Sequence, residues 1–207
     1  TPEIIQSLKQ KGIEFAEITL HIGSGTFSPL KSDNVIEHNM HYEQIIISKE
    51  FIKQLINFLE NRQGYIIHTG TTTVRTLETL YWFGVKAYLK KLNDFNFAQW
   101  EWVSLQNGAD ITFLESLHSL LNYIENKNIN QIIGDTQLFI VPGYKYRTCD
   151  GLITNFHLPK STLLLLVAAF SGRDLFKKIY NEALANDYRF LSYGDASFLL
   201  KSSPNAR

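Results

Sequence analysis

A run of apolar residues near the C-terminus, Leu163 to Phe170, constrains the fold of this chain more than any other segment. A membrane span needs roughly 20 apolar residues, so this run is too short to cross a bilayer and predicts a helix of the protein core. Pro159 and the hydroxyls of Ser161 and Thr162 would start that helix, and Gly172 would stop it.

The segment directly before this helix, residues 150–161, mixes apolar residues with side chains that can bind a ligand. Asn155, His157 and Lys160 precede the helix N-terminus. The first amides of a helix have no partner within the helix and its dipole is positive there, so such a place favours an anion or a polar ligand. A capped core helix with a satisfied histidine is an equally good interpretation.

Composition sets broad limits. The 207 residues are 44% hydrophobic, which is enough for one sizeable core. Lys and Arg (20) balance Asp and Glu (20), so only a local basic face would indicate nucleic acid. The single cysteine, Cys149, excludes a disulfide framework and favours a reducing compartment, the cytoplasm. No signal peptide or membrane span is visible, and Thr1-Pro2 begins a helix without a start methionine, so we expect further sequence upstream.

Alternating patterns predict the fold class. Strands are expected at 13–22, 44–47, 65–68, 138–141 and 196–200, and helices at 2–11, 49–62, after Gly70, at 112–126 and at 173–186, with 85–108 as a loop or irregular hairpin. Strands that alternate with helices predict an α/β fold with three layers and a mainly parallel sheet. We expect one domain over residues 1–200 and a disordered tail over 201–207.

Two glycine-containing turns follow predicted strands. Gly23, Gly25 and Thr26 form one, which lacks the third glycine of a dinucleotide fingerprint. Gly70-Thr71-Thr72 forms the other, which lacks the G-K-[ST] ending of a P-loop and leads into a helix carrying Arg75. Ligands of open α/β sheets bind at the carboxyl ends of strands, so both turns are candidate ligand contacts. The alternatives are a plain turn, a threonine-rich cap and a surface pair between Arg75 and Glu78.

The segment around His38, His41 and Glu43 groups imidazoles with a carboxylate. Together with His21 and His157 these residues could ligate a metal, but no H-E-x-x-H pattern supports that interpretation. A loop that supplies proton-transfer groups fits better. An exposed loop without function is the alternative.

Two further segments combine aromatic and charged residues. Tyr144-Lys145-Tyr146-Arg147 interleaves bases with aromatics, which suits phosphates and nucleobases but also a half-exposed strand edge. Residues 187–195 place Arg189 and Asp195 around a glycine, as in a loop or strand edge that lines a pocket.

Five motifs in this order resemble those of the S-adenosylmethionine:tRNA ribosyltransferase-isomerases of queuosine biosynthesis. No single motif would be specific, but together they cover most of the chain. They are T-L-H-I-G-S-G-T-F-S-P-L (19–30), H-N-M-H-Y-E (38–43), G-T-T-T-V-R-T-L-E (70–78), L-F-I-V-P-G-Y with D-G-L-I-T-N-F-H-L-P-K-S-T-L (138–144 and 150–163), and Y-R-F-L-S-Y-G-D (188–195).

The resemblance also shows departures. Members of the family carry an additional N-terminal half with a small β-barrel domain, which is absent from this chain, so we expect the chain to be the C-terminal portion. His68 stands where a small apolar residue is usual, and Asp195-Ala196-Ser197 departs from the family's D-A-M ending.

The resemblance implies an unusual reaction. The ribosyl part of S-adenosylmethionine is transferred to the 7-aminomethyl-7-deazaguanine base at the wobble position of tRNA and isomerised, which gives epoxyqueuosine and releases adenine and methionine. The implied partners are tRNA and S-adenosylmethionine, with no metal, no other cofactor and no membrane. The oligomeric state stays open.

Site roles follow from that chemistry. A sulfonium acidifies the adjacent ribose methylene, so a general base is needed, and adenine leaves more easily when it is protonated or hydrogen-bonded. The expected catalytic residues are His21, His41, Glu43, His157 and Asp195. The expected substrate-binding residues are Gly23, Gly25, Thr26, Gly70, Thr71, Thr72, Arg75, Asn155, Lys160 and Arg189. The alternatives are a non-catalytic RNA- or nucleoside-binding module and a metal-dependent hydrolase.

Overall fold

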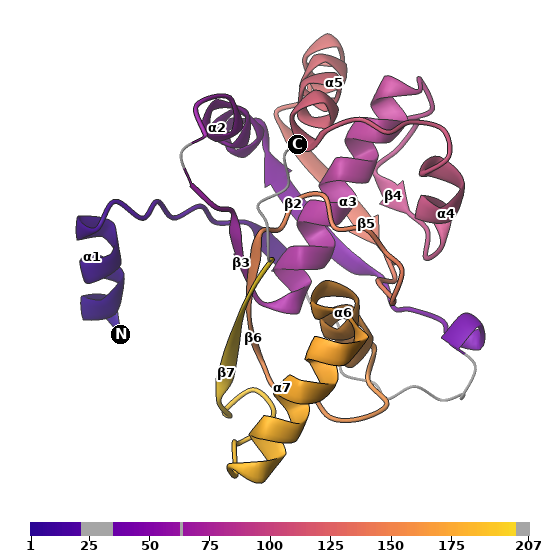
Figure 1. Ribbon diagram of the computed structural model, residues 1–207. Coiled ribbons are helices and arrows are strands. Elements are labelled where there is room, and N and C mark those ends of the chain that lie inside the picture. The colour runs from indigo at the N-terminus through magenta and orange to yellow at the C-terminus, as the bar shows by residue number, and fades with distance from the viewer. Residues whose placement is uncertain (22–34, 63, 202–207) are drawn as a thin grey trace.

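The computed structural model describes residues 1–21, 35–62 and 64–201, and these contain two small mixed sheets (Figure 1). The first has the strand order β1 (Thr19–His21), β2 (Glu43–Ser48), β5 (Gln131–Thr136) and β4 (Asn96–Phe97). The second has the order β3 (Ile67–Thr69), β6 (Gly151–Asn155) and β7 (Ala196–Leu200). Helices surround and separate these sheets.

The prediction of a mainly parallel sheet is wrong. β2 pairs antiparallel with both β1 and β5, and β6 pairs antiparallel with β7; only β4–β5 and β3–β6 are parallel. The reason lies in the strands themselves. Buried and exposed residues alternate along β2 and β5, with Ile45 and Ile47 inside and Gln44 outside. Strands with one solvent-exposed face are typical of antiparallel sheets, whereas parallel strands are usually apolar on both faces.

The helix α3 (Thr71–Tyr88) crosses the centre of the molecule and contacts strands of both sheets (Figure 1). Residues 74–86 of this helix are buried on all sides, as expected for a helix inside the core. Gly84 allows α5 (Phe113–Asn126) to pack closely against it, because a Cβ at Gly84 would lie 2.3 Å from the carbonyl oxygen of Ser116. Because α3 contacts strands of both sheets, it forms a single rigid element between them.

Helices with clear capping residues formed where the sequence predicts them. α2 (Lys49–Glu60) begins at the cap Ser48, and α5 begins at the capping box of Thr112 and Glu115. α6 (Thr162–Ser171) begins at Ser161 and ends at Gly172, as expected. α1 (Pro2–Gln10), α7 (Arg173–Ala185) and β7 also lie within a residue or so of their predicted bounds.

Other predicted elements are wrong. The expected strand at 138–141 is a buried irregular segment, and the strand lies just before it as β5. The expected loop at 85–108 contains the end of α3, β4 and the short helix α4 (Glu101–Leu105). The strand expected at 13–22 is reduced to β1, and a 3-10 turn, η2 (Val35–Glu37), lies before β2.

Lys201 is part of the folded chain instead of a disordered tail. Its backbone amide donates to the carbonyl oxygen of Asp150 at 2.9 Å, and its ammonium donates to that of Tyr146 at 3.2 Å. Residues 202–207 lie outside the described part of the chain. Over the described residues, no helix combines the length and apolar character that a bilayer crossing requires.

Candidate functional site

The carboxyl ends of β3 and β6 lie side by side, and they bring two of the predicted ligand segments together. The two strands are parallel, with Thr69 opposite Ile153, and the amide of Gly70 donates to the carbonyl oxygen of Ile153 at 2.8 Å. The Gly70–Thr72 turn therefore lies next to Asn155, which ends β6. We refer to this edge of the second sheet as the β3–β6 edge.

Gly70 starts α3 in a conformation that favours glycine. Its φ is 88°, and it occupies the N-cap position of the helix. The first bond of the α3 ladder runs from the amide of Val74 to the carbonyl oxygen of Gly70, so the amides of residues 71–73 precede it. These amides and the positive end of the helix dipole face the β3–β6 edge and suit a polar or anionic ligand group.

Asn155 connects the β3–β6 edge to the segment that precedes β7. Its side-chain amide donates to the carbonyl oxygens of Gly194 and Asp195, each at 3.4 Å. The neighbouring Arg189 and Asp195 pair with each other at 3.2 Å, and Asp195 also accepts the amide of Arg189 at 2.8 Å. These hydrogen bonds from Arg189 lower the pKa of Asp195, so its carboxylate is ionised at neutral pH.

His157 lies two residues beyond the end of β6. Its Nε2 lies 2.9 Å from the hydroxyl of Thr154, and its backbone amide donates to the hydroxyl of Tyr180 at 3.2 Å. Burial lowers the pKa of His157 to about 4, because the charged imidazolium is poorly solvated there. The ring is therefore neutral at pH 7. Lys160 follows at a left-handed φ of 58° on the exposed surface.

Glu43 and Arg75 form an ion pair in the protein interior. Their charged atoms lie 2.7 Å apart, and the side chains are 1% and 4% exposed. Arg75 also donates to the carbonyl oxygen of Leu138 at 3.0 Å. Burial lowers the pKa of Arg75, and Glu43 opposes that effect. The sequence predicted one residue for catalysis and the other for substrate, but the structure brings the two together.

The suggested surface pair of Arg75 and Glu78 is wrong, because Glu78 is also buried and has other partners. Its carboxylate accepts the hydroxyl of Tyr144 at 2.8 Å, the hydroxyl of Thr148 at 2.7 Å and the amides of Arg147 and Thr148. Glu78 thus holds the segment 144–148 against α3.

The other three histidines that the sequence grouped as candidate ligands belong to the first sheet and its flanking loop. His21 is exposed at the end of β1 and lies opposite Gln44, and His41 is exposed just before β2. His38 is buried, with its ring 5.7 Å from that of Phe139. Within the described ranges, no three His, Cys, Asp or Glu side chains are grouped so that they could hold a metal ion. Gly23, Gly25 and Thr26 lie outside the described residues.

Comparison with known proteins identifies the family. Residues 1–199 match the family described as Queuosine biosynthesis protein. The chain belongs to this family.

Its relatives are enzymes by name. The chain is 40% identical over 200 residues to proteins named S-adenosylmethionine:tRNA ribosyltransferase-isomerase from Thermotoga petrophila and Thermotoga sp. strain RQ2. These matches cover 97% of this chain and 47% of each relative. The crystal structure of S-adenosylmethionine tRNA ribosyltransferase from Thermotoga maritima is similar, with a TM-score of 0.60 and 34% identity over 97% of this chain and 50% of that one. The chain spans about half the length of the relatives it matches.

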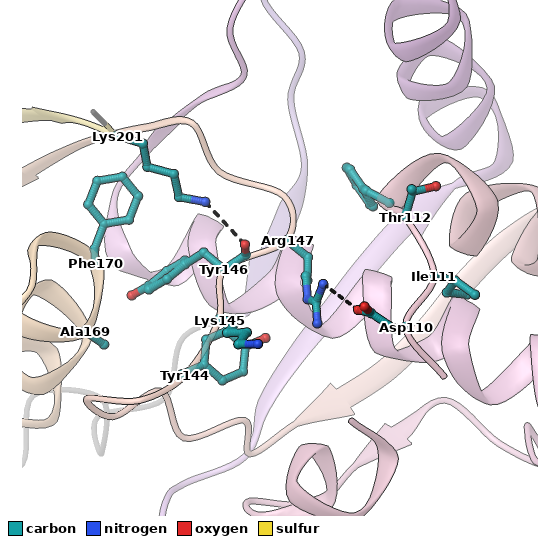
Figure 2. Close-up of a pocket in the computed structure, with 11 residues that line it drawn as sticks. Asp110, Ile111, Thr112, Tyr144, Lys145, Tyr146, Arg147, Ala169, Phe170 and Lys201 are labelled. Carbon is teal, nitrogen blue, oxygen red and sulfur yellow. Dashed lines mark hydrogen bonds and ion pairs between the residues drawn. The ribbon is translucent and has the colours of Figure 1, made fainter. Parts of the chain in front are cut away.

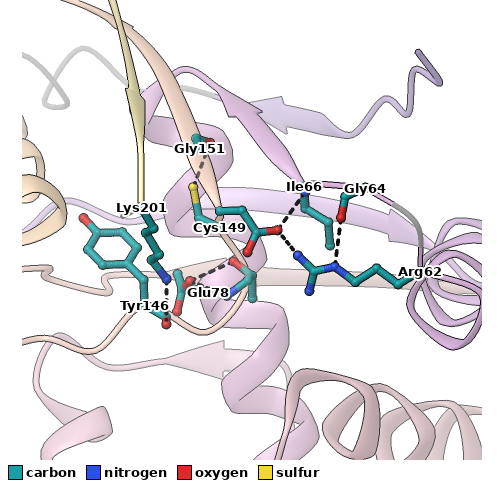
Figure 3. Close-up of polar contacts among 10 residues, drawn as sticks. Arg62, Gly64, Ile66, Glu78, Tyr146, Cys149, Gly151 and Lys201 are labelled. Carbon is teal, nitrogen blue, oxygen red and sulfur yellow. Dashed lines mark hydrogen bonds and ion pairs between the residues drawn. The ribbon is translucent and has the colours of Figure 1, made fainter. Parts of the chain in front are cut away.

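This member of the queuosine family also contains a buried carboxylate, that of Asp150, for which the sequence analysis predicted no structural role. Asp150 accepts the amide of Ile66 at 2.8 Å and binds the guanidinium of Arg62, which also donates to Gly64 (Figure 3). These contacts fix the start of β6 beside β3. No local pattern could have indicated them, because Arg62 and Asp150 lie far apart in the sequence and meet only in the fold.

Proposed function

We propose that this chain forms part of a tRNA ribosyltransferase-isomerase, and that the β3–β6 edge binds S-adenosylmethionine. The reaction would transfer and isomerise its ribosyl group onto the 7-aminomethyl-7-deazaguanine base at the tRNA wobble position, giving epoxyqueuosine with release of adenine and methionine. One observation carries the proposal. Three motif segments that lie far apart in the sequence, at 70–72, 155–157 and 189–195, converge on this edge.

The α3 N-terminus suits the polar end of the substrate. The amides of residues 71–73 can bind the methionine carboxylate or the ribose hydroxyls, and Arg189 and Lys160 add positive charge for a carboxylate or a tRNA phosphate. Asn155 holds the segment 194–195 and so orients Asp195. An ionised Asp195 suits accepting a hydrogen bond from the adenine amino group better than donating a proton.

The general base that removes the ribose proton is drawn from His21, His41, Glu43 and His157. Of the four, His157 lies at the β3–β6 edge, and its neutral ring can accept a proton, although burial lowers its pKa to about 4 and so makes it a weaker base than a free imidazole. Glu43 is held by Arg75, so a role in positioning α3 suits it better. We therefore place His157 first in the proposed mechanism. The mechanism requires no metal and no cofactor beyond the co-substrate, and we propose that it runs in the cytoplasm.

A turnover assay with the full-length protein tests this function. S-adenosylmethionine and tRNA bearing the aminomethyl-deazaguanine base are supplied, and mass spectrometry then follows free adenine and epoxyqueuosine in digested tRNA. Joint appearance of both products is the expected result. Binding of tRNA without either product would overturn the enzymatic proposal and favour a non-catalytic RNA-binding module.

A further inference from the structure

A pocket lies at the other end of the β3–β6–β7 sheet from the β3–β6 edge. Its volume is about 550 Å³, and three segments line it, 110–113, 144–147 and 169–170, together with Lys201 (Figure 2). Lys201 directly follows Leu200, which pairs with Gly151 at the start of β6, whereas Asn155 at the β3–β6 edge pairs with Ala196. At about 3.3 Å per residue, the length of β6 separates the two places by about 13 Å.

Positive charge predominates in this pocket. Lys145, Arg147 and Lys201 line it, against one carboxylate, Asp110. Lys145 is exposed and forms no ion pair with any residue that the structure describes. Because the whole chain has no net charge, this is a local excess and not a general property of the surface.

Arg147 is available to an incoming anion. Its Nη1 lies 3.1 Å from Asp110; the Arg147 side chain is 24% exposed, but that of Asp110 is 85% exposed, and a pair with so exposed a carboxylate is weak. Its Nε is buried and has no hydrogen-bond partner within the described residues, so the terminal nitrogens of the guanidinium would make the contact. A guanidinium offers five donors in a planar fork, which matches the oxygen atoms of a phosphate.

Two of the three cations, Arg147 and Lys201, are held in place before any ligand arrives. The backbone amide of Arg147 donates to Glu78 at 3.0 Å, and its guanidinium lies 5.7 Å from the ring of Tyr81. Lys201 donates to the carbonyl oxygen of Tyr146 and lies over the rings of Tyr146 and Phe170, at 5.8 and 6.0 Å. Fixed donors lose little freedom on binding, which favours affinity.

We propose that this pocket binds a phosphate of an RNA backbone and so holds the tRNA while its base reaches the β3–β6 edge. The inference that the RNA is tRNA rests on the proposed function, whereas the phosphate chemistry rests on the pocket alone. The volume exceeds that of a phosphate and leaves room for the attached ribose. The rings of Tyr146 and Phe170 provide an apolar wall for that sugar.

The test measures tRNA affinity of the full-length protein by fluorescence anisotropy between about 50 and 200 mM salt. The variants are Lys145→Gln and Arg147→Gln, with Lys127→Gln, an exposed lysine after α5, as the matched control. Each lost phosphate contact should weaken binding about five-fold at about 150 mM salt and reduce the salt slope by about 0.7 to 0.9. The control should match the parent protein. If Arg147→Gln does not fold, the comparison of Lys145→Gln with the parent protein decides the test.

The outcomes distinguish failure of the pocket assignment from failure of the enzymatic proposal. If the parent protein binds tRNA and both pocket variants match it, the pocket assignment is wrong. If the variants lose affinity but the parent shows no turnover, the pocket stands and the enzymatic proposal is wrong. If the parent does not bind tRNA, both are wrong. Titration with inorganic phosphate tests whether the pocket binds a small phosphorylated ligand instead of RNA. If Lys145→Gln weakens phosphate binding but leaves RNA affinity unchanged, the RNA assignment is wrong.

Discussion

The guanidinium of Arg75 contacts the carboxylate of Glu43 at 2.7 Å in the protein interior, and this contact joins α3 to the first residue of β2. Removing one partner of a buried ion pair leaves an uncompensated charge, which costs more than the pair itself contributes. Glu43→Gln and Arg75→Met should therefore each lower the free energy of unfolding by about 3–5 kcal/mol. Denaturant titration measures the change.

The double variant Glu43→Leu with Arg75→Met should recover most of that loss, because no buried charge is left behind. The exposed pair of Lys53 and Glu125, 3.0 Å apart, is the control. Lys53→Met should change stability by less than about 1 kcal/mol. If Glu43→Gln is equally mild, the pair does not support the fold in the way argued above.

Gly84 gives a sharp test of the contact between α3 and α5. Replacing glycine by alanine inside a helix normally adds about 1 kcal/mol of stability. Here the new Cβ would lie 2.3 Å from the carbonyl oxygen of Ser116, so the helices must separate, and Gly84→Ala should lose about 3 kcal/mol or more. Gly64→Ala, whose Cβ would meet Phe58 at an ordinary 3.9 Å, is the control. A stabilised Gly84→Ala protein, measured by thermal unfolding, would contradict the packing.

His157 should make the stability of the protein depend on pH. Its folded pKa of about 4 lies below the usual 6.5, so the unfolded chain binds the extra proton. The stabilisation is complete above pH 6.5 and is lost as pH falls from about 6.5 towards 4. The full shift would correspond to about 3 kcal/mol, and the partial exposure of the ring reduces this to about 1–2 kcal/mol.

The measurement compares denaturant unfolding of the parent and of His157→Gln at pH 7 and pH 5. The free-energy difference between them should shrink at the lower pH, since glutamine does not titrate. His118, an exposed histidine that pairs with Glu60 at 3.1 Å, provides the matched substitution His118→Gln. A difference that stays constant from pH 7 to pH 5 would contradict the lowered pKa.

Asp195 should matter for turnover more than for folding. Its pair with Arg189 lies on the surface, so Asp195→Asn should leave the unfolding midpoint almost unchanged. Loss of one charged hydrogen bond to the substrate should reduce kcat/KM about ten-fold. Steady-state assays check this, with Glu60→Gln as the surface control. Unchanged kinetics would remove Asp195 from the proposed site.

Local signals predicted the helices well and the sheets poorly. Caps such as Ser161, Gly172 and the Thr112–Glu115 box act over three or four residues, so they are visible in the sequence. β5 was missed because Gly134 interrupts its apolar pattern. That glycine is required by a distant contact, since a Cβ there would lie 2.0 Å from the carbonyl oxygen of Phe95.

In the candidate site, too, contacts between residues close in the sequence could be predicted and contacts between distant residues could not. Arg189 and Asp195, six residues apart, were predicted to line one pocket, and they do lie together. Glu43 and Arg75 were assigned separate roles, because nothing local shows that the first residue of β2 meets the first turns of α3. The role of Glu78 was missed for the same reason, since its partners follow about seventy residues later in the chain.

The continuity of α3 has a mechanical consequence. The helix follows Gly70 at the β3–β6 edge, and Glu78, eight residues after Gly70, accepts the backbone amide of Arg147 at the proposed phosphate pocket. At 1.5 Å per residue this is a spacer of about 12 Å whose length cannot vary without breaking the helix. An RNA backbone whose phosphate is bound at the pocket would therefore place its neighbouring nucleotides at a fixed distance from the β3–β6 edge. The protein would then select the target nucleotide by its position along the RNA instead of by base sequence.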